Sequence, residues 1–278
     1  MAEQKMSRNL YGGLSFGRGL ATPVSMLIIF FSLTLVSTIT YYYAVSRVEA
    51  RKESLKMVAA EERMLDLEEA ISSSAWSPGS TRVIYFSWYG GELRIEPTGN
   101  FLTINVTMGD SSEVLFNSST GLVLYRLPFT RLSGVGRWLL GDKRAIINMS
   151  SAYQAQVHIE LGDVRQELRV SYRPLVSSSV GGLVDGRRVN NIRIYIINLN
   201  ESQALSSGGE FHSKVHCSGV STRVHTYNLT SSESAVSITA TLNGSERTVE
   251  VPITSGPSGS TVRFEVLVSH IEVKGASV

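Results

Sequence analysis

The chain has 278 residues, with 26 Lys and Arg against 24 Asp and Glu, so its formal net charge is +2. This balance excludes the basic surface of a nucleic-acid-binding protein, and the length allows one sizeable domain or two small ones. Only 18% of the residues are charged, which favours a β-rich protein outside the cytoplasm. The single cysteine, Cys217, excludes an intrachain disulfide, and we expect it to be a small buried apolar residue.

The first element in the chain is an uncharged stretch from Leu20 to Val45, which follows a short basic leader at residues 1–19. No Asp, Glu, Lys, Arg or His interrupts this stretch. A membrane-spanning helix needs about 20 apolar residues, so the stretch predicts a single transmembrane helix. Three tyrosines near its end fit an interfacial aromatic belt: Tyr41, Tyr42 and Tyr43. The lipid bilayer is therefore an expected partner.

The next segment, residues 47–71, contains no Gly or Pro and has the composition of a strong helix. We therefore expect residues 20–75 to form one transmembrane and stalk helix with two apolar stripes. One stripe consists of Val48, Leu55, Val58 and Leu65, and the other of Met57, Ala60, Met64, Leu67 and Ile71. A helix that packs only on its own domain needs one stripe. Two stripes indicate either a second contact, with another chain, or a helix whose buried face changes along its length.

Residues 76–278 show the alternation of apolar and polar residues that is typical of β-strands. Asn243-Gly244, between two alternating runs, predicts a hairpin. The fold class is therefore predicted as α+β, with the long helix followed by an all-β antiparallel sandwich. One continuous body is favoured, and residues 177–182 are a candidate boundary between two sub-sheets. The expected strands are 82–86, 101–106, 155–161, 165–172, 191–197, 223–229, 235–242, 247–253 and 262–273.

Most asparagines of this region begin N-x-[ST] triplets, which are acceptors for N-glycosylation. This clustering favours a glycosylated extracellular face, and the alternative is coincidence in a chain rich in Ser and Thr. The candidate glycosylation sites are Asn105, Asn117, Asn148, Asn200, Asn228 and Asn243.

The sequence offers little that is typical of catalysis or metal binding. His212, His216 and His225 lie near Cys217, but there is no second Cys or tight pair of ligands for a closed zinc site. No nucleophile elbow and no phosphate-binding loop is present. We therefore expect no enzyme activity, no metal site and no cofactor.

The junction of leader and apolar stretch reads F-G-R-G-L-A-T-P-V over residues 16–24. It resembles the class III signal of type IV prepilins, and its second half is similar to archaeal pilin-like proteins. The resemblance implies that a prepilin peptidase recognises Arg18 and Gly19 and cuts before Leu20, so that the apolar helix stays on the mature chain. Val24 stands where bacterial pilins carry a Glu that archaeal relatives often lack. Segments 120–128 and 171–176 are similar to parts of large archaeal pilin-like surface proteins.

The resemblance implies a structural cell-surface protein, a pilin-like subunit of the large minor-pilin type in an archaeal type IV-like filament. Its body would lie outside the cell, and its role would be adhesion or spacing. The implied partners are copies of itself or related pilins, the prepilin peptidase and a membrane assembly platform. The alternatives are a non-polymerising membrane-anchored binding or sensing domain, and an anchored hydrolase for which no nucleophile is identified. The residues expected on the assembly face of the helix are Leu27, Phe30, Val48, Leu55, Val58 and Leu65.

Overall fold

The structure is a computed structural model with one helix followed by a β-rich body, which confirms the predicted α+β class. Most strand pairs of the body are antiparallel, as predicted. The chain divides into two compact units, up to Ser54 and from Leu55 onward, which are considered separately. Side chains are described from residue 23 to residue 275. The structure describes residues 18–87, 89–127, 135–148, 153–162, 165–230 and 233–276.

Helix α1 runs from Arg18 to Ser74 without a break, close to the single helix expected over residues 20–75. Its apolar part has a mean hydropathy of 1.9 and is long and apolar enough to cross a membrane. Hydroxyl groups in this part donate to carbonyls three or four residues earlier at 2.8–2.9 Å. These bonds satisfy the hydroxyls without water, which is the requirement inside a bilayer. The donors are Ser32, Thr34, Thr38 and Thr40.

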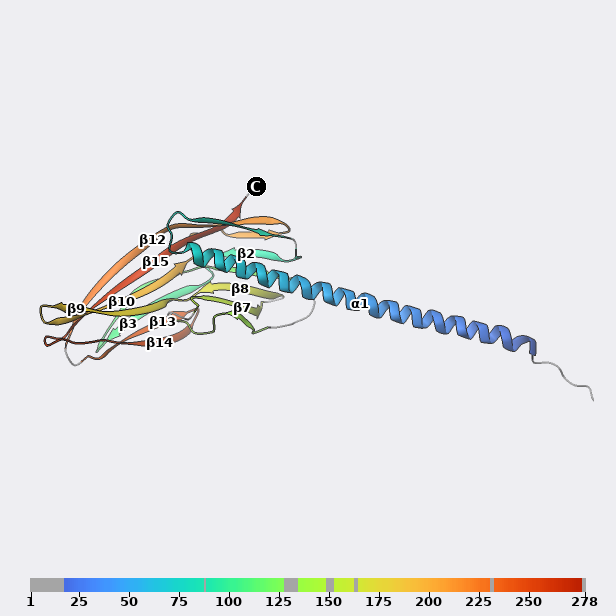
Figure 1. The fold of residues 1–278 in the computed structure, drawn as a ribbon, viewed down its shortest axis with the longest axis horizontal. Helices are drawn as coiled ribbons and strands as arrows, with labels where there is room; N and C mark the ends of the chain where they lie inside the picture. The colour runs from blue at the N-terminus through green and yellow to red at the C-terminus, as the bar shows by residue number, and fades with distance from the viewer. Residues whose placement is uncertain are drawn as a thin grey trace, which may run out of the picture. The chain divides into compact units, whose positions relative to one another are not determined.

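Three sheets form the body (Figure 1). Sheet A contains, in spatial order, β1 (Thr81–Phe86), β12 (Phe211–Leu229), β15 (Ser260–Ala276), β10 (Arg187–Asn198) and β9 (Leu175–Val184). Sheet B contains β11 (Leu205–Gly208), β2 (Glu92–Glu96), β5 (Leu122–Arg126), β8 (Gln166–Tyr172), β7 (Ala155–Leu161) and β6 (Trp138–Leu140). Sheet C contains β14 (Ser245–Pro252), β13 (Ala235–Leu242), β3 (Phe101–Met108) and β4 (Ser111–Ser119). Among the paired strands described, only β10 and β15 run parallel.

Each strand expected from the sequence is present, and the Asn243-Gly244 turn joins β13 to β14 as predicted. Both turn residues have positive φ, 49° and 80°, as such hairpin turns require. The sequence pattern did not reveal β2, β4, β5, β6, β9 or β11. Residues 177–182, the candidate boundary, lie inside β9. They pair with β10 in sheet A, with a bulge in the register.

The body has two apolar cores, and they lie on opposite faces of sheet A. Successive residues of a strand point to opposite faces, and β15 uses both. Val262, Phe264 and Val266 contribute to the core shared with sheet C. Ile271 and Val273, of opposite parity, contribute to the core shared with sheet B. Sheet C therefore covers one face of sheet A at one end, and sheet B covers the other face at the other end.

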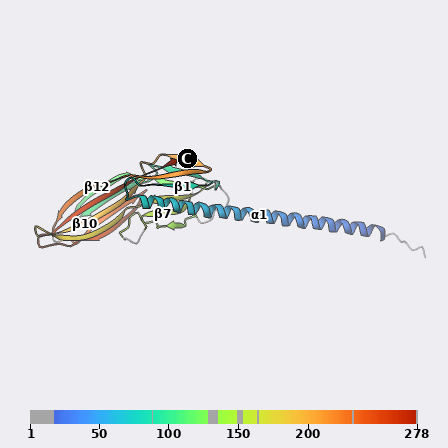
Figure 2. The same ribbon diagram turned by 45° about the horizontal axis from the view of Figure 1, so that its top comes forward.

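The C-terminal turns of α1 belong to the core that lies between sheets A and B. Figure 2 shows these turns running beside β1 and β7. Ala60, Met64, Leu67 and Ile71 are each 1% exposed or less, and Met57 packs against the same core. The second predicted stripe is therefore the one that packs on the body. Because the last four turns supply side chains to this core, this end of the helix folds as part of the β body.

Candidate functional site

The predicted processing junction coincides with the start of α1. Arg18, Gly19 and Leu20 are the first three residues of the helix, and their side chains lie outside the described part of the chain. Pro23 lies inside the helix, near its start, where few backbone N–H groups need an intrahelical acceptor. Cleavage before Leu20 stays a prediction.

The expected assembly face is largely exposed. In the first unit Leu27, Phe30 and Val48 are 57–68% exposed. In the second unit Leu55 and Val58, at 70% and 56%, remain uncovered beside the buried stripe. Leu65, the sixth expected residue, is half-buried and packs against the core of its own body. The expected assembly face is thus exposed at five of its six residues.

Acidic residues of the stalk divide into those held within the chain and those left at the surface. Arg137 donates to Glu61, and Arg63 forms an ion pair with Asp66 at 2.7 Å. Glu62 and Glu69 are exposed. Of the carboxylates at residues 61–69, Glu61 and Asp66 pair with arginines and Glu68 accepts from Ser72. An electrostatic contact of this segment with another chain would therefore depend first on Glu62 and Glu69.

The six sequons differ in how their amides are held. Asn117 and Asn228 are exposed, and their Oδ1 atoms accept hydrogen bonds from Thr103 and Thr261. These bonds orient each amide through its Oδ1 atom. Asn148 is also exposed, but the next two residues of its triplet lie outside the described residues.

The other sequons are less available. Asn105 and Asn200 are half-buried, and the Oδ1 atom of each is buried without a hydrogen-bond partner. Asn243 is exposed, but its Nδ2 donates to Oδ1 of Asn100 while its Oδ1 accepts from the Phe101 N–H at 2.8 Å. A glycan on this nitrogen would have to coexist with the contact that joins the hairpin turn to the start of β3.

We therefore expect glycans on Asn117 and Asn228 and none on Asn243 when the chain is made in cells that glycosylate N-x-[ST] triplets. Glycopeptide mass spectrometry of the native protein measures the occupancy of each site. Asn117→Gln and Asn228→Gln should each remove one glycan mass, whereas Asn243→Gln should leave the mass of attached glycan unchanged. Full occupancy of Asn243 would contradict this ranking.

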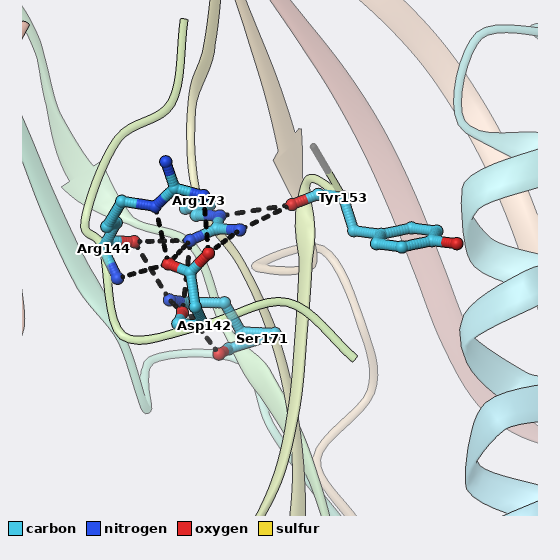
Figure 3. Close-up of polar contacts among 6 residues, drawn as sticks. Asp142, Arg144, Tyr153, Ser171 and Arg173 are labelled. Atoms are coloured by element: carbon cyan, nitrogen blue, oxygen red, sulfur yellow. Dashed lines mark hydrogen bonds and ion pairs between the residues drawn. The ribbon is translucent and has the colours of Figure 1, made fainter. Parts of the chain in front are cut away.

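A polar cluster centres on Arg173, whose side chain is fully buried. Figure 3 shows its guanidinium between the Asp142 carboxylate and the Tyr153 carbonyl. Nε and Nη2 donate to the Tyr153 carbonyl at 3.2 and 2.9 Å. Nη1 donates to the Asp142 carboxylate at 2.6 Å and to the carbonyls of Asp142 and Arg144 at 3.2 and 3.1 Å. The Gln156 side chain donates to the same two carbonyls.

The chemistry of this cluster is that of a clamp. Hydrogen bonds from Arg144 and then Arg173 hold the pKa of the Asp142 carboxyl far below its usual range. Each guanidinium nitrogen of Arg173 has an acceptor within the protein, so no donor is left for a substrate. The cluster fixes the segment that follows β6, including Ala145 and Ile146, which enter the core beside sheet C. Residues 171–176 carry a sequence resemblance, but no local pattern predicts that Arg173 is buried, because a single arginine has no periodicity.

The histidines and the cysteine lie apart. His212 and His216 share the outer face of β12, about 13 Å apart along the strand, whereas Cys217 lies on the opposite face. Cys217 is 0% exposed, which confirms the expected buried residue. Among the described residues, no group of three or more His, Cys, Asp or Glu side chains is placed to hold a metal ion. No protein-family model, curated protein or solved structure matches the chain.

Proposed function

We propose that the chain is a pilin-like subunit of an archaeal type IV-like filament, anchored in the membrane by α1 before assembly. The observation that carries this proposal is the double use of one uninterrupted helix. Its uncharged N-terminal part is suited to lipid or to other apolar helices, and its C-terminal turns supply core residues of the β body. A subunit of this design joins a folded body and an apolar segment through one continuous helix.

Removal of the leader has a physical purpose in this proposal. A charged leader holds the N-terminal end of the helix at the membrane surface, because charges are costly inside a bilayer. Once the leader is cut, an apolar helix is free to leave the bilayer and pack against other copies, where its hydroxyls stay satisfied by its own carbonyls. The uncovered Leu55 and Val58, in the second unit, offer further apolar side chains for contacts with other copies.

The body is the outward-facing part of this subunit, and the sequons support an extracellular position. Its partners are copies of itself or related pilins, a prepilin peptidase and a membrane assembly platform. The buried arginine cluster and the separated histidines offer no catalytic arrangement, so the proposed role is adhesion or spacing.

Processing provides the test, because an ordinary signal anchor would not be cut at this junction. Mass spectrometry of the protein from cells that contain a prepilin peptidase should find Leu20 as the first residue. Gly19→Val should leave the leader attached and abolish filament incorporation, since a branched side chain would block the cleavage site. Gly13→Val, within the same leader, is the matched control and should be processed normally.

Two results would contradict the proposal. A native chain that still begins at Met1 would favour the non-polymerising anchored domain. A chain that has lost the whole apolar stretch would show that the helix is a cleaved secretion signal.

A further inference from the structure

Three polar side chains from separate segments meet on one face of sheet A: Ser221 of β12, His270 of β15 and Glu201, which follows β10. The Ser221 hydroxyl lies 3.0 Å from Nε2 of His270. The other ring nitrogen, Nδ1, lies 3.0 Å from Oε1 of Glu201. Serine, histidine and carboxylate are thus connected in the order, and through the ring nitrogens, of a hydrolase triad. His270 is not one of the three histidines near Cys217 in the sequence.

The strand register explains why Ser221 and His270 share a face. Gly219 pairs with His270, and Ser221 pairs with Val268, so Ser221 is a diagonal neighbour of the histidine. The register shifts by one residue just before Gly219, because Ser218 is a bulge without a partner on β15. Without the bulge Ser221 would point to the opposite face of the sheet. Bulges that re-aim a side chain in this way recur beside active sites.

The Glu201 carboxylate is placed to orient the imidazole. Nδ1 of His270 is buried and makes no aligned hydrogen bond to any described residue. A small rotation of Glu201, whose side chain is 46% exposed, completes one, and such bonds often tighten only when substrate binds. The second carboxylate oxygen accepts from the Ser218 hydroxyl at 2.6 Å. A proton on Nδ1, facing the carboxylate, leaves Nε2 as the acceptor for the Ser221 hydroxyl.

The site has open space for a substrate. Ser221 is exposed, so its hydroxyl is accessible. Gly219, directly opposite His270, has no atom within 4 Å of the place where a Cβ would stand. The gap beside the ring is therefore as large as a small side chain. Asn228, which we expect to carry a glycan, is seven residues further along β12, roughly 24 Å from Ser221.

A backbone N–H next to Ser221 is directed toward the open edge of the sheet. β1 pairs with only the first six residues of β12, and in the described part of the chain no strand pairs with that side further along. Cys217 directs its N–H to that side. Cys217 pairs with Ile271 and Thr222 with Leu267, which are four residues apart on β15. Because direction alternates along a strand, the Thr222 N–H also points outward. The residue after the nucleophile supplies an oxyanion donor in many serine hydrolases.

We propose that Ser221, His270 and Glu201 form a hydrolytic site for small acyl esters. His270 accepts the Ser221 proton as Oγ attacks the ester carbonyl carbon, and the Thr222 N–H binds the oxyanion that forms. The ester C–O bond then breaks, and His270 gives the proton to the leaving alcohol. Water attacks the acyl-serine in the same way, so that the carboxylic acid leaves and Ser221 regains its proton. Ser221 and His270 are catalytic residues, and Glu201 is a positioning residue.

The geometry selects this class of substrate. The space beside His270 suits an acetyl-sized acyl group, because it has the volume of a missing small side chain. One N–H donor stabilises an oxyanion less than the usual pair, since loss of a donor costs roughly 10²–10³-fold in kcat. Esters need less of this stabilisation than amides, because an alcohol leaves more readily than an amine. The activity would add to the adhesion or spacing role, and it requires neither leader cleavage nor polymerisation.

A fluorophosphonate probe on the full chain in detergent tests the nucleophile. Its reaction forms an Oγ–P bond at Ser221 and breaks the P–F bond, so that fluoride leaves and His270 takes the proton. Peptide mass spectrometry should find the label on Ser221, and His270→Gln should slow labelling roughly a hundredfold. Ser206 is the matched control and should stay unlabelled, because it is exposed and bonds the Glu92 carboxylate without a histidine.

Hydrolysis of p-nitrophenyl acetate measures turnover. Ser221→Ala gives the background, because imidazole itself cleaves this ester. Glu201→Gln should lower kcat and leave KM unchanged, since Glu201 acts through His270 and not on the ester. Each variant should keep the wild-type urea unfolding midpoint, which separates lost chemistry from a lost fold.

Two results would overturn the site: a wild-type chain whose Ser221 is labelled no faster than Ser206, or equal labelling of Ser221 in His270→Gln. The first needs no variant, so it decides the question even if a substitution prevents folding. The N-terminal mass decides the filament proposal separately, because the label is read whether or not the leader has been cut.

Discussion

Replacing Arg173 with methionine is expected to destabilise the β body by about 3–5 kcal/mol. The side chain is fully buried and bonds three backbone carbonyls in addition to the Asp142 carboxylate. Methionine fills similar space but donates nothing, so the Tyr153 carbonyl would lose both of its bonds to Arg173. Urea unfolding of the full chain in detergent, followed by tryptophan fluorescence, measures the change in the free energy of unfolding.

Two further variants separate charge from geometry. Arg173→Lys keeps the charge but lacks the planar fork, and it should recover only part of the loss. Asp142→Asn tests the carboxylate. Because the pKa of Asp142 is lower in the folded state than in the unfolded chain, the ionised carboxylate stabilises the fold above about pH 4, and this stabilisation is lost as the pH falls further. The variant should lack this acid-dependent loss. If Arg173→Met had the same free energy of unfolding as the wild type, the cluster would not contribute to the stability of the body.

Replacing Leu67 with alanine is expected to destabilise the same body by about 2–5 kcal/mol, the usual range for a buried leucine. Leu67 is 0% exposed and lies in the core between sheets A and B. The result matters for function, because it measures how firmly the helix is attached to the body. The same urea titration provides the measurement.

Val58→Ala is the matched control on the uncovered side of the same helix, where the residue is 56% exposed. Its effect on the free energy of unfolding should stay within about 0.5 kcal/mol, while incorporation into filaments should fall. Equal destabilisation by both variants would show that the stripe with Val58 is covered within a single chain. If Val58→Ala were stable and entered filaments normally, the stripe with Val58 would not be part of the assembly surface.

The helix and many of the strands follow from local patterns that act over a few residues. The uncharged stretch and the Gly- and Pro-free segment after it predict helix without reference to the rest of the chain. Asn243-Gly244 specifies a hairpin because both residues tolerate positive φ. The two apolar stripes were also visible, but only the structure shows that Leu65 packs on its own body.

The strands that were missed are short or lack alternation. β2 has five residues, three of them charged, and β4 has a bulge near Val114 that breaks its period of two. Residues 177–182 have the Ser and Gly composition of a linker, yet β10 pairs with them in β9. Backbone hydrogen bonds between strands do not require a particular side chain, so composition alone did not reveal these strands.

The sequence by itself determined that this protein has one long helix with an apolar N-terminal part, a β-rich body and a buried lone cysteine, because each depends on residues close together in the chain. Only the tertiary structure decided that β15 has a core on each face, that Arg173 closes a buried clamp and that half of β12 is an open edge. These features join residues far apart in sequence, and their partners are set by strand order and register, which local patterns do not encode.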